Sequence, residues 1–197
     1  MELKTIKLGS YQTNCYIAWG EGVDRCIVID PGFEPERVLE EVRHWEKTLE
    51  AILLTHGHFD HVGGVKDLVA QTDCRVFVCQ VDTTLPSKLI DGMICYTDTY
   101  AEGDTLELAG LRLQVLQTPG HTPGSVCLQC GDVLFSGDTL FAGTIGRTDL
   151  PGGSMAQMRQ SLARLKALPG NFRVLPGHGE ESTLDEERVY NPYLQGL

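Results

Sequence analysis

Four side chains that commonly bind metal ions lie within six consecutive residues of this sequence. Residues 56–61 read His-Gly-His-Phe-Asp-His and directly follow a short apolar segment. In an extended segment, residues i and i+2 share a face, so His56 and His58 can bind one ion, whereas on a helix they would point about 200° apart. Asp60 and His61 then require a turn, which the Gly-Gly pair just beyond them allows. We therefore predict a metal site here rather than a solvated polar loop.

Three further residues could complete the coordination of an ion, each close to glycine at the end of a predicted strand. They are His121 in Thr-Pro-Gly-His-Thr-Pro-Gly, Asp138 in Phe-Ser-Gly-Asp-Thr and His178 in Pro-Gly-His-Gly. Each alone would more often be a turn residue or a helix cap. Together with the motif they supply seven nitrogen and oxygen ligands. That set is too large for one tetrahedral ion and suits two ions that share a carboxylate.

Strands and helices in alternation are predicted to position these residues. In the first half, strands are expected over residues 2–8, 14–19, 25–30, 51–55 and 75–79, with helices over 35–45 and from Gly64 to about Gln71. In the second half, short strands are expected over residues 105–108, 111–116, 125–129, 133–135 and 172–175, separated by turns. Ser154 and Gln157 predict the start of a helix that stops at Pro169-Gly170, and residues 184–194 predict a short helix broken near Pro192.

Three features of the sequence are predicted to be structural rather than catalytic. Residues 80–100 lack a sustained apolar period, and we expect a connection there with about one helical turn. Met155 and Met158 lie on the apolar stripe of a helix and are predicted to be core residues. Cys127 and Cys130, three apart in a strand, should face opposite sides of a sheet and pack in the core rather than form a redox or zinc pair.

The element order predicts an α/β fold. Two sheets with helices outside them favour an αββα sandwich, and a mixed single sheet is the alternative that the pattern leaves open. Neither a tandem repeat nor a low-complexity linker divides the chain. We therefore expect one domain over residues 1–197.

Composition excludes several classes of partner. The 197 residues carry a net charge of −11 and show no basic stripe, which argues against nucleic acid and anionic membranes. The longest apolar run, residues 15–19, is far shorter than a bilayer span, and the first residues do not resemble a signal peptide. Seven cysteines without a dense pattern favour reduced thiols. We expect a cytoplasmic protein that acts on a small molecule; the oligomeric state is open, and a monomer is allowed.

The ligand pattern resembles the metallo-β-lactamase superfamily, and the resemblance covers essentially the whole chain. The His-X-His-X-Asp-His motif of that family matches residues 56–61, and its later single ligands match the three residues named above in the expected order. The resemblance implies an αββα fold. It also implies that one metal is held by His56, His58 and His121 and the other by Asp60, His61 and His178, with Asp138 bridging. Asp30 matches an upstream aspartate that has a structural role or supports the ligands.

Within this superfamily, residues 140–149 (Leu-Phe-Ala-Gly-Thr-Ile-Gly-Arg-Thr-Asp) resemble the glyoxalase II group, hydrolases of S-acylglutathione thioesters. Aspartate rather than cysteine at position 138 and the lack of an export signal argue against the main secreted β-lactamases. Full-length glyoxalase II has an added C-terminal helical domain, and this chain ends about twenty residues after the last ligand. The expectation is therefore a short, single-domain branch. Arg147 is either a substrate contact or, by pairing with a carboxylate, a brace for its own loop.

These observations predict a hydrolase with two divalent ions, zinc first and iron or manganese as alternatives. Bound zinc lowers the pKa of water to about 7, so a bridging hydroxide could attack the thioester carbonyl while Asp60 orients it. The alternative from another reaction class is a persulfide dioxygenase, which shares the scaffold but uses a single iron held by two histidines and one aspartate. A purely structural metal site is disfavoured, because such sites are usually closed and rich in cysteine.

Overall fold

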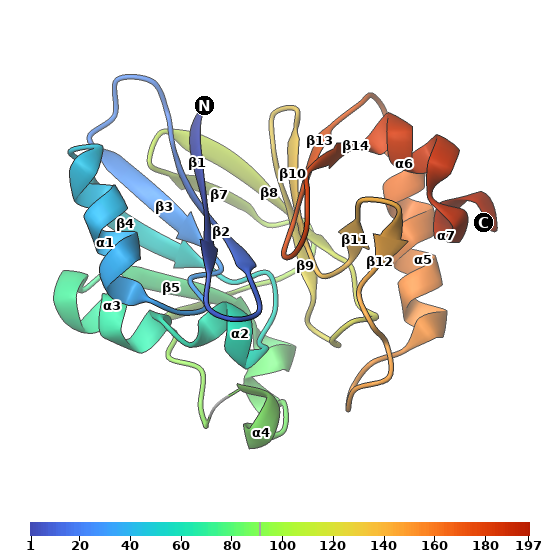
Figure 1. The fold of residues 1–197 in the computed structure, drawn as a ribbon, viewed down its shortest axis with the longest axis horizontal. Coiled ribbons are helices and arrows are strands. Elements are labelled where there is room, and N and C mark those ends of the chain that lie inside the picture. The colour runs from blue at the N-terminus through green and yellow to red at the C-terminus, as the bar shows by residue number, and fades with distance from the viewer. Residues whose placement is uncertain (91) are drawn as a thin grey trace.

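The first half of the chain forms a six-stranded sheet in which the strands follow one another in sequence order (Figure 1). The computed structural model of the protein describes residues 1–90 and 92–197. The first three strands pair antiparallel and the rest pair parallel. The strands are β1 (Glu2–Leu8), β2 (Thr13–Trp19), β3 (Arg25–Ile29), β4 (Thr48–Leu53), β5 (Arg75–Cys79) and β6 (Asp98–Tyr100). The connections carry the helices α1 (Pro35–His44), α2 (Phe59–Val62), α3 (Val65–Thr72), η1 (Gln80–Thr84) and α4 (Ser87–Ile90).

The second half forms another six-stranded sheet, in the order β14-β13-β10-β9-β8-β7. Its strands are β7 (Thr105–Leu108), β8 (Leu111–Gln117), β9 (Val126–Cys130), β10 (Val133–Gly137), β13 (Arg173–Pro176) and β14 (Ser182–Thr183). A small hairpin of β11 (Leu140–Phe141) and β12 (Thr144–Ile145) follows β10. The helices are α5 (Met155–Lys166), α6 (Leu184–Tyr190) and α7 (Pro192–Gln195), which lie beside the second sheet in Figure 1.

Along each buried strand, successive side chains point to opposite faces of the sheet, and this alternation separates the apolar core into layers. On β4, Ala51 and Leu53 belong to the apolar cluster between the two sheets, whereas Ile52 belongs to the cluster shared with α1 and α3. A third cluster joins the outer face of the second sheet to α5, α6 and α7. The prediction of an αββα sandwich is confirmed, and the alternative of a single mixed sheet is wrong.

Most predicted elements are present, with shifted boundaries. The strand predicted over residues 51–55 runs instead from Thr48 to Leu53, so Thr55 belongs to the loop that carries the histidines. The stretch of residues 80–100 holds two short helical segments and an edge strand rather than a single turn. The hairpin of β11 and β12 was not expected, because two-residue strands are too short to show a period.

Of the two methionines predicted as core residues, only one is buried. Met158 is fully buried against the second sheet, but Met155 is 40% exposed at the first turn of α5, outside the apolar cluster. Ser154 caps this helix as predicted, accepting a hydrogen bond from the Gln157 amide at 3.3 Å. Cys127 and Cys130 are both buried, in clusters on opposite faces of the sheet, as their spacing predicts. Among the described residues, no helix has the length and apolarity needed to cross a membrane.

Candidate metal centre

The predicted ligands come from both sheets, each after the end of a strand. Four of them follow β4 in the first sheet, and three follow β8, β10 and β13 in the second. The expected turn in the motif is α2, which begins at Phe59 and carries Asp60 and His61. The described side chains form three groups of three, within each of which the ligand atoms lie within 4.8 Å of one another; one of them, Asp30 with His56 and His61, overlaps the other two, which together hold six of the predicted ligands. We call these two the histidine trio (His56, His58 and His121) and the mixed trio (Asp60, His61 and His178).

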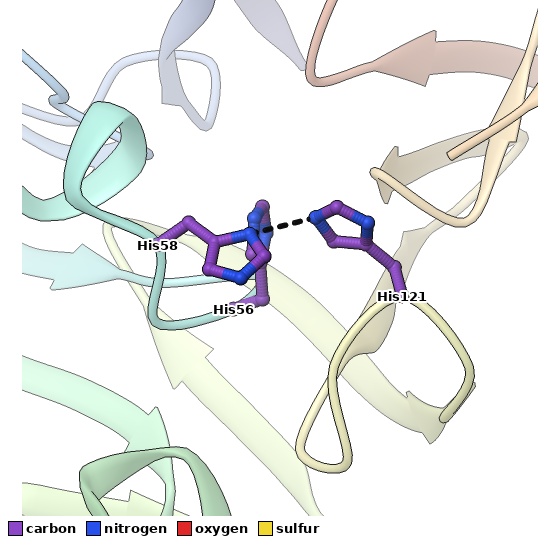
Figure 2. Close-up of side chains that lie close together, drawn as sticks. All are labelled: His56, His58 and His121. Carbon is purple, nitrogen blue, oxygen red and sulfur yellow. Dashed lines mark hydrogen bonds between the residues drawn. The ribbon is translucent and has the colours of Figure 1, made fainter. Parts of the chain in front are cut away.

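The rings of the histidine trio face one another in a buried space (Figure 2). His58 Nδ1 lies 2.8 Å from His121 Nε2. The Nε2 atoms of His56 and His58 are buried and have no hydrogen-bond partner among the described residues. Burial lowers the pKa of His58 to about 4 and that of His56 well below its usual value. These imidazoles are therefore neutral near pH 7 and keep nitrogen lone pairs for a cation.

Two oxygen atoms orient rings of the histidine trio from behind. The Arg147 carbonyl oxygen lies 2.8 Å from His121 Nδ1, and the Thr55 hydroxyl lies 3.2 Å from His56 Nδ1. A carbonyl can only accept, so Nδ1 of His121 carries the proton and Nε2 is left free as a ligand. This contact ties the loop that contains Arg147 to the site through its backbone.

The mixed trio is organised by charge. His178 Nε2 lies 3.2 Å from the nearer Asp60 oxygen and 3.3 Å from His61 Nε2. Burial alone would lower the pKa of His61, but the carboxylates of Asp138, Asp30 and Asp60 outweigh it and raise the value to about 9. Burial opposes ionisation of Asp60 as well, yet contacts with His178 and His61 lower its pKa to about 2. The mixed trio therefore attracts positive charge.

Asp30, for which the family resemblance implies a structural or supporting role, lies behind the mixed trio. One of its oxygens lies 3.0 Å from His61 Nδ1 and accepts a hydrogen bond from the Thr55 hydroxyl at 2.6 Å. The other accepts from the Thr55 amide at 2.8 Å. Its φ of 52° is left-handed, a conformation that aspartate tolerates better than most residues. Asp30 also comes within ligand distance of His56 and His61, but these contacts already occupy its oxygens.

Asp138 lies between the two trios. Its oxygens are 3.4 Å from His121 Nε2, 3.5 Å from His61 Nε2 and 3.7 Å from His178 Nε2. Its Oδ1 is buried without a hydrogen-bond partner. Gly177 keeps this space open, because a Cβ atom there would lie 2.2 Å from that oxygen and 2.7 Å from the His61 ring. A carboxylate in this position can contribute to two ions at once.

The loop that carries His178 is tied to the first sheet. The Asn14 amide of β2 donates to the Gly177 carbonyl at 2.8 Å, and its side chain donates to the Pro176 and Gly179 carbonyls at 3.0 Å each. Tyr16 of the same strand donates to Pro176 at 2.7 Å. These bonds bring the last predicted ligand to the others across the junction of the two halves.

The chemistry of the donors fits two divalent ions. Neutral imidazole nitrogens and carboxylate oxygens suit zinc, iron and manganese, and several of them are buried without a partner in the protein. A buried polar atom without a partner is costly, so these atoms indicate a missing positive group.

A cavity of about 460 Å³ opens above the two trios. His58, Asp60, His121, Asp138 and His178 line it together with a mostly apolar wall of Tyr11, Phe59, Leu89, Phe141, Leu150 and Arg147. Arg147 lines the cavity and also makes a two-point contact with Asp149, at 2.7 and 2.8 Å, a position compatible with both roles predicted for it. Apart from Arg147, sequence patterns did not single out the wall residues, because lone apolar side chains in loops carry no period.

Comparison with known proteins gives the family context. The sequence model described as the metallo-beta-lactamase superfamily matches residues 8–178. The chain is 33% identical to a protein named hydroxyacylglutathione hydrolase GloC of Haemophilus influenzae, over 98% of each. It is 36% identical to the probable metallo-hydrolase YqgX of Bacillus subtilis, over 100% of this chain and 99% of that one.

Solved structures agree in fold. The crystal structure of BLEG-1, described as a B3 metallo-beta-lactamase, superposes with a TM-score of 0.90 at 33% identity, covering 99% of this chain and all of the other. ETHE1 from Myxococcus xanthus gives a TM-score of 0.89 at 30% identity, covering 100% and 85%. TTHA1623, solved in a di-iron-bound form, gives 0.84 at 39% identity, covering 97% and 100%.

Proposed function

Because the chain belongs to the metallo-beta-lactamase superfamily, we propose that it is a hydrolase with two divalent ions that cleaves thioesters. The proposed substrates are S-lactoylglutathione and related hydroxyacylglutathiones. The observation that carries the proposal is the pair of trios with Asp138 between them at the base of a cavity. The similarity to a hydroxyacylglutathione hydrolase over nearly the full length of both chains supports the substrate class.

In this proposal each trio holds one ion and Asp138 contributes to both. Zinc is the proposed ion. Iron and manganese are the alternatives, and a relative solved with two irons keeps iron in consideration. When bound, two such ions activate water and polarise a carbonyl oxygen at neutral pH.

The side chains of the protein then position the reactants. Asp60, at the junction of the cavity and the mixed trio, is proposed to orient the attacking water or hydroxide toward the carbonyl by accepting a hydrogen bond from it. A thiol with a pKa of about 8.5 departs without a strong general acid. The apolar wall packs against the acyl and thiol arms and reduces access of bulk water. Arg147 acts mainly as the brace of its loop, which orients His121 through a backbone carbonyl.

One alternative has a specific observation in its favour. The mixed trio consists of two histidines and one carboxylate, a set typical of non-haem iron oxygenases. A persulfide dioxygenase with one iron would use a set of this composition. The presence of a second trio of ligands favours the hydrolase, because a mononuclear enzyme leaves half of the donors without a role.

The deciding experiment measures metal content and reaction in one preparation. Purified protein is analysed for zinc, iron and manganese and then assayed with S-lactoylglutathione, a small lactone, a β-lactam and glutathione persulfide. About two ions per chain with thioester hydrolysis is the expected result. One iron per chain with oxygen consumption would establish the dioxygenase, and hydrolysis of the β-lactam alone would overturn the thioester assignment.

The proposed setting is the cytoplasm, with a small molecule as the partner. All seven cysteines are free, and six of them are buried. A chain with this many unpaired thiols suits a reducing compartment.

A further inference from the structure

We propose that Asp82 is a positioning residue of the histidine trio, an inference that rests on the proposed function. Asp82 lies in η1, directly after β5, within the stretch that the sequence predicted to be a connection. Its side chain is completely buried and does not line the cavity. Neither trio includes it, and the proposed reaction does not use it. Burying a carboxylate is costly unless other groups compensate its charge, so the hydrogen-bond partners of Asp82 should explain why it is buried.

The Asp82 carboxylate joins the two segments that carry the histidine trio. Its Oδ2 accepts hydrogen bonds from the Gly57 amide at 2.8 Å and from the Thr122 hydroxyl at 2.7 Å. Its Oδ1 accepts from the Gly124 amide at 2.6 Å. Gly57 separates two of the three histidines, and Thr122 directly follows the third. One side chain therefore sets the distance between the two loops.

Only an acceptor with two oxygens satisfies these partners. Two of them are backbone amides, which can only donate. The Thr122 hydroxyl also contacts the Ser125 hydroxyl at 2.7 Å, and the Ser125 oxygen accepts from the Thr122 amide at 3.0 Å. The Ser125 hydroxyl then donates to the Thr122 hydroxyl, which donates to Asp82. In this arrangement each of the two hydroxyls donates one hydrogen bond and accepts one. An asparagine in place of Asp82 would direct an NH₂ group at one of the donors.

Close packing leaves these loops little freedom around the carboxylate. A Cβ atom on Gly124 would lie 2.5 Å from Asp82 Oδ1, so the amide can approach only because the residue is glycine. A Cβ atom on Gly57 would lie 3.2 Å from the Asp82 Cβ and 2.8 Å from the Ile94 side chain. Both loops are built around this one side chain.

The effect should be confined to one of the two ions. The hydrogen bonds of Asp82 reach Gly57, Thr122 and Gly124 and none of the residues of the mixed trio. The mixed trio has its own supporting carboxylate, Asp30. Asp82→Asn should therefore weaken the ion of the histidine trio and spare the other.

The test is a zinc titration of metal-free protein in competition with a chelating dye. Wild type is expected to bind two ions. Asp82→Asn is expected to weaken one of them by about tenfold or more, the range found when groups that orient metal ligands are changed. The same substitution added to His58→Ala, which disables the histidine trio, should leave the affinity of the other ion unchanged.

Two matched controls separate positioning from general stability. Glu187→Gln changes another buried carboxylate, which accepts from the Gly143 amide at 3.0 Å and from the Asn191 side chain at 2.7 Å, and should leave both zinc affinities unchanged. Thr122→Val removes one bond to Asp82, whereas Thr122→Ser keeps a hydroxyl there. We expect the first to weaken zinc binding and the second to preserve it, and this pair decides the question if Asp82→Asn does not fold.

Wild-type affinities for both ions in folded Asp82→Asn, or an equal loss in the His58→Ala background, would overturn the inference. Equal affinities in the two Thr122 variants would overturn it as well. A wild-type protein that binds fewer than two ions would instead contradict the proposed function, which keeps the two failures distinct.

Discussion

The histidine trio and the mixed trio lie side by side but are held by different forces. Burial and neutral oxygens shape the first: the pKa of His58 is lowered to about 4, and a carbonyl and a hydroxyl orient its neighbours. Carboxylates shape the second, where the pKa of His61 is raised to about 9. The histidine trio offers nitrogen lone pairs that need no deprotonation near pH 7, whereas the mixed trio offers the negative charge of its carboxylates. Neighbouring sites for similar ions can thus differ in how they depend on protons and on supporting residues.

Asp138 is the residue common to both trios, so its loss should have the largest effect. Asp138→Ala removes an oxygen within 3.7 Å of three ligand rings and should abolish stable binding of both ions. Thioester hydrolysis should fall by more than about 10³-fold, because even indirect changes around a metal cost about 10–100-fold. Metal analysis and a steady-state assay measure the two effects together. Full activity in metal-free Asp138→Ala protein would contradict the metal mechanism.

Removing one ligand from either trio should leave a single ion. His58→Ala should lose the ion of the histidine trio, and His178→Ala that of the mixed trio, each lowering hydrolysis by about 10²-fold or more. Metal content per chain, expected to fall from two to one, is the measurement. His44→Ala, an exposed histidine outside both trios, is the control and should retain two ions. If either ligand variant lost both ions, the trios would not be separable sites.

Asp30 should matter more to the mixed trio, which it contacts directly, than to the histidine trio, which it reaches through Thr55. Asp30→Asn weakens the contact with His61 Nδ1 and one contact with Thr55, and should lower zinc affinity of the mixed trio by about 10–100-fold. Titration of this variant in the His58→Ala background isolates the affected ion. The affinity of the histidine trio, measured in the His178→Ala background, should change much less. Equal losses in the two backgrounds would show that Asp30 acts on the whole fold.

Proton competition should distinguish the trios by how steeply their zinc affinities depend on pH. Below about pH 9 the metal-free protein holds a proton on His61, which an ion must displace, so affinity of the mixed trio should rise about tenfold per pH unit up to that value. His58 is already neutral above about pH 4, so the histidine trio should change less between pH 6 and 9. Zinc titrations of the two single-site variants across this range provide the comparison. Parallel slopes would contradict the assigned difference.

The sequence could predict candidate ligands because they follow strand ends in glycine-rich segments, a local pattern that can be recognised without knowledge of the fold. Local periods predicted most of the strands and favoured the αββα layers, but they left a single mixed sheet open, and it was the family resemblance that implied the sandwich. Met155 shows the limit of such patterns: it lies on the predicted helical stripe, yet it is 40% exposed and outside the apolar cluster.

Asp82 shows a second limit. Its partners are 25 to 42 residues away in sequence, and nothing in its own neighbourhood marks it. Asp82 follows the parallel strand β5, as Asp30 follows β3 and the histidine motif follows β4. Because the apolar residues of the stretch 80–100 show no regular spacing, the position of Asp82 after a strand was not recognised from the sequence. The apolar wall of the cavity, including Tyr11 and Phe141, is defined only once loops from both sheets meet.

The bonds between β2 and the His178 loop bear on the order of assembly. Tyr16 and Pro176 are 160 residues apart, so this junction closes one of the longest loops in the chain. Contacts of such separation form late, because the entropy of closing the loop must be lost before they contribute. During synthesis the last ligand of the histidine trio leaves the ribosome with residue 121, and the last ligand of the mixed trio leaves it with residue 178. All three ligands of the neutral trio are therefore synthesised before the ligands of the mixed trio are complete.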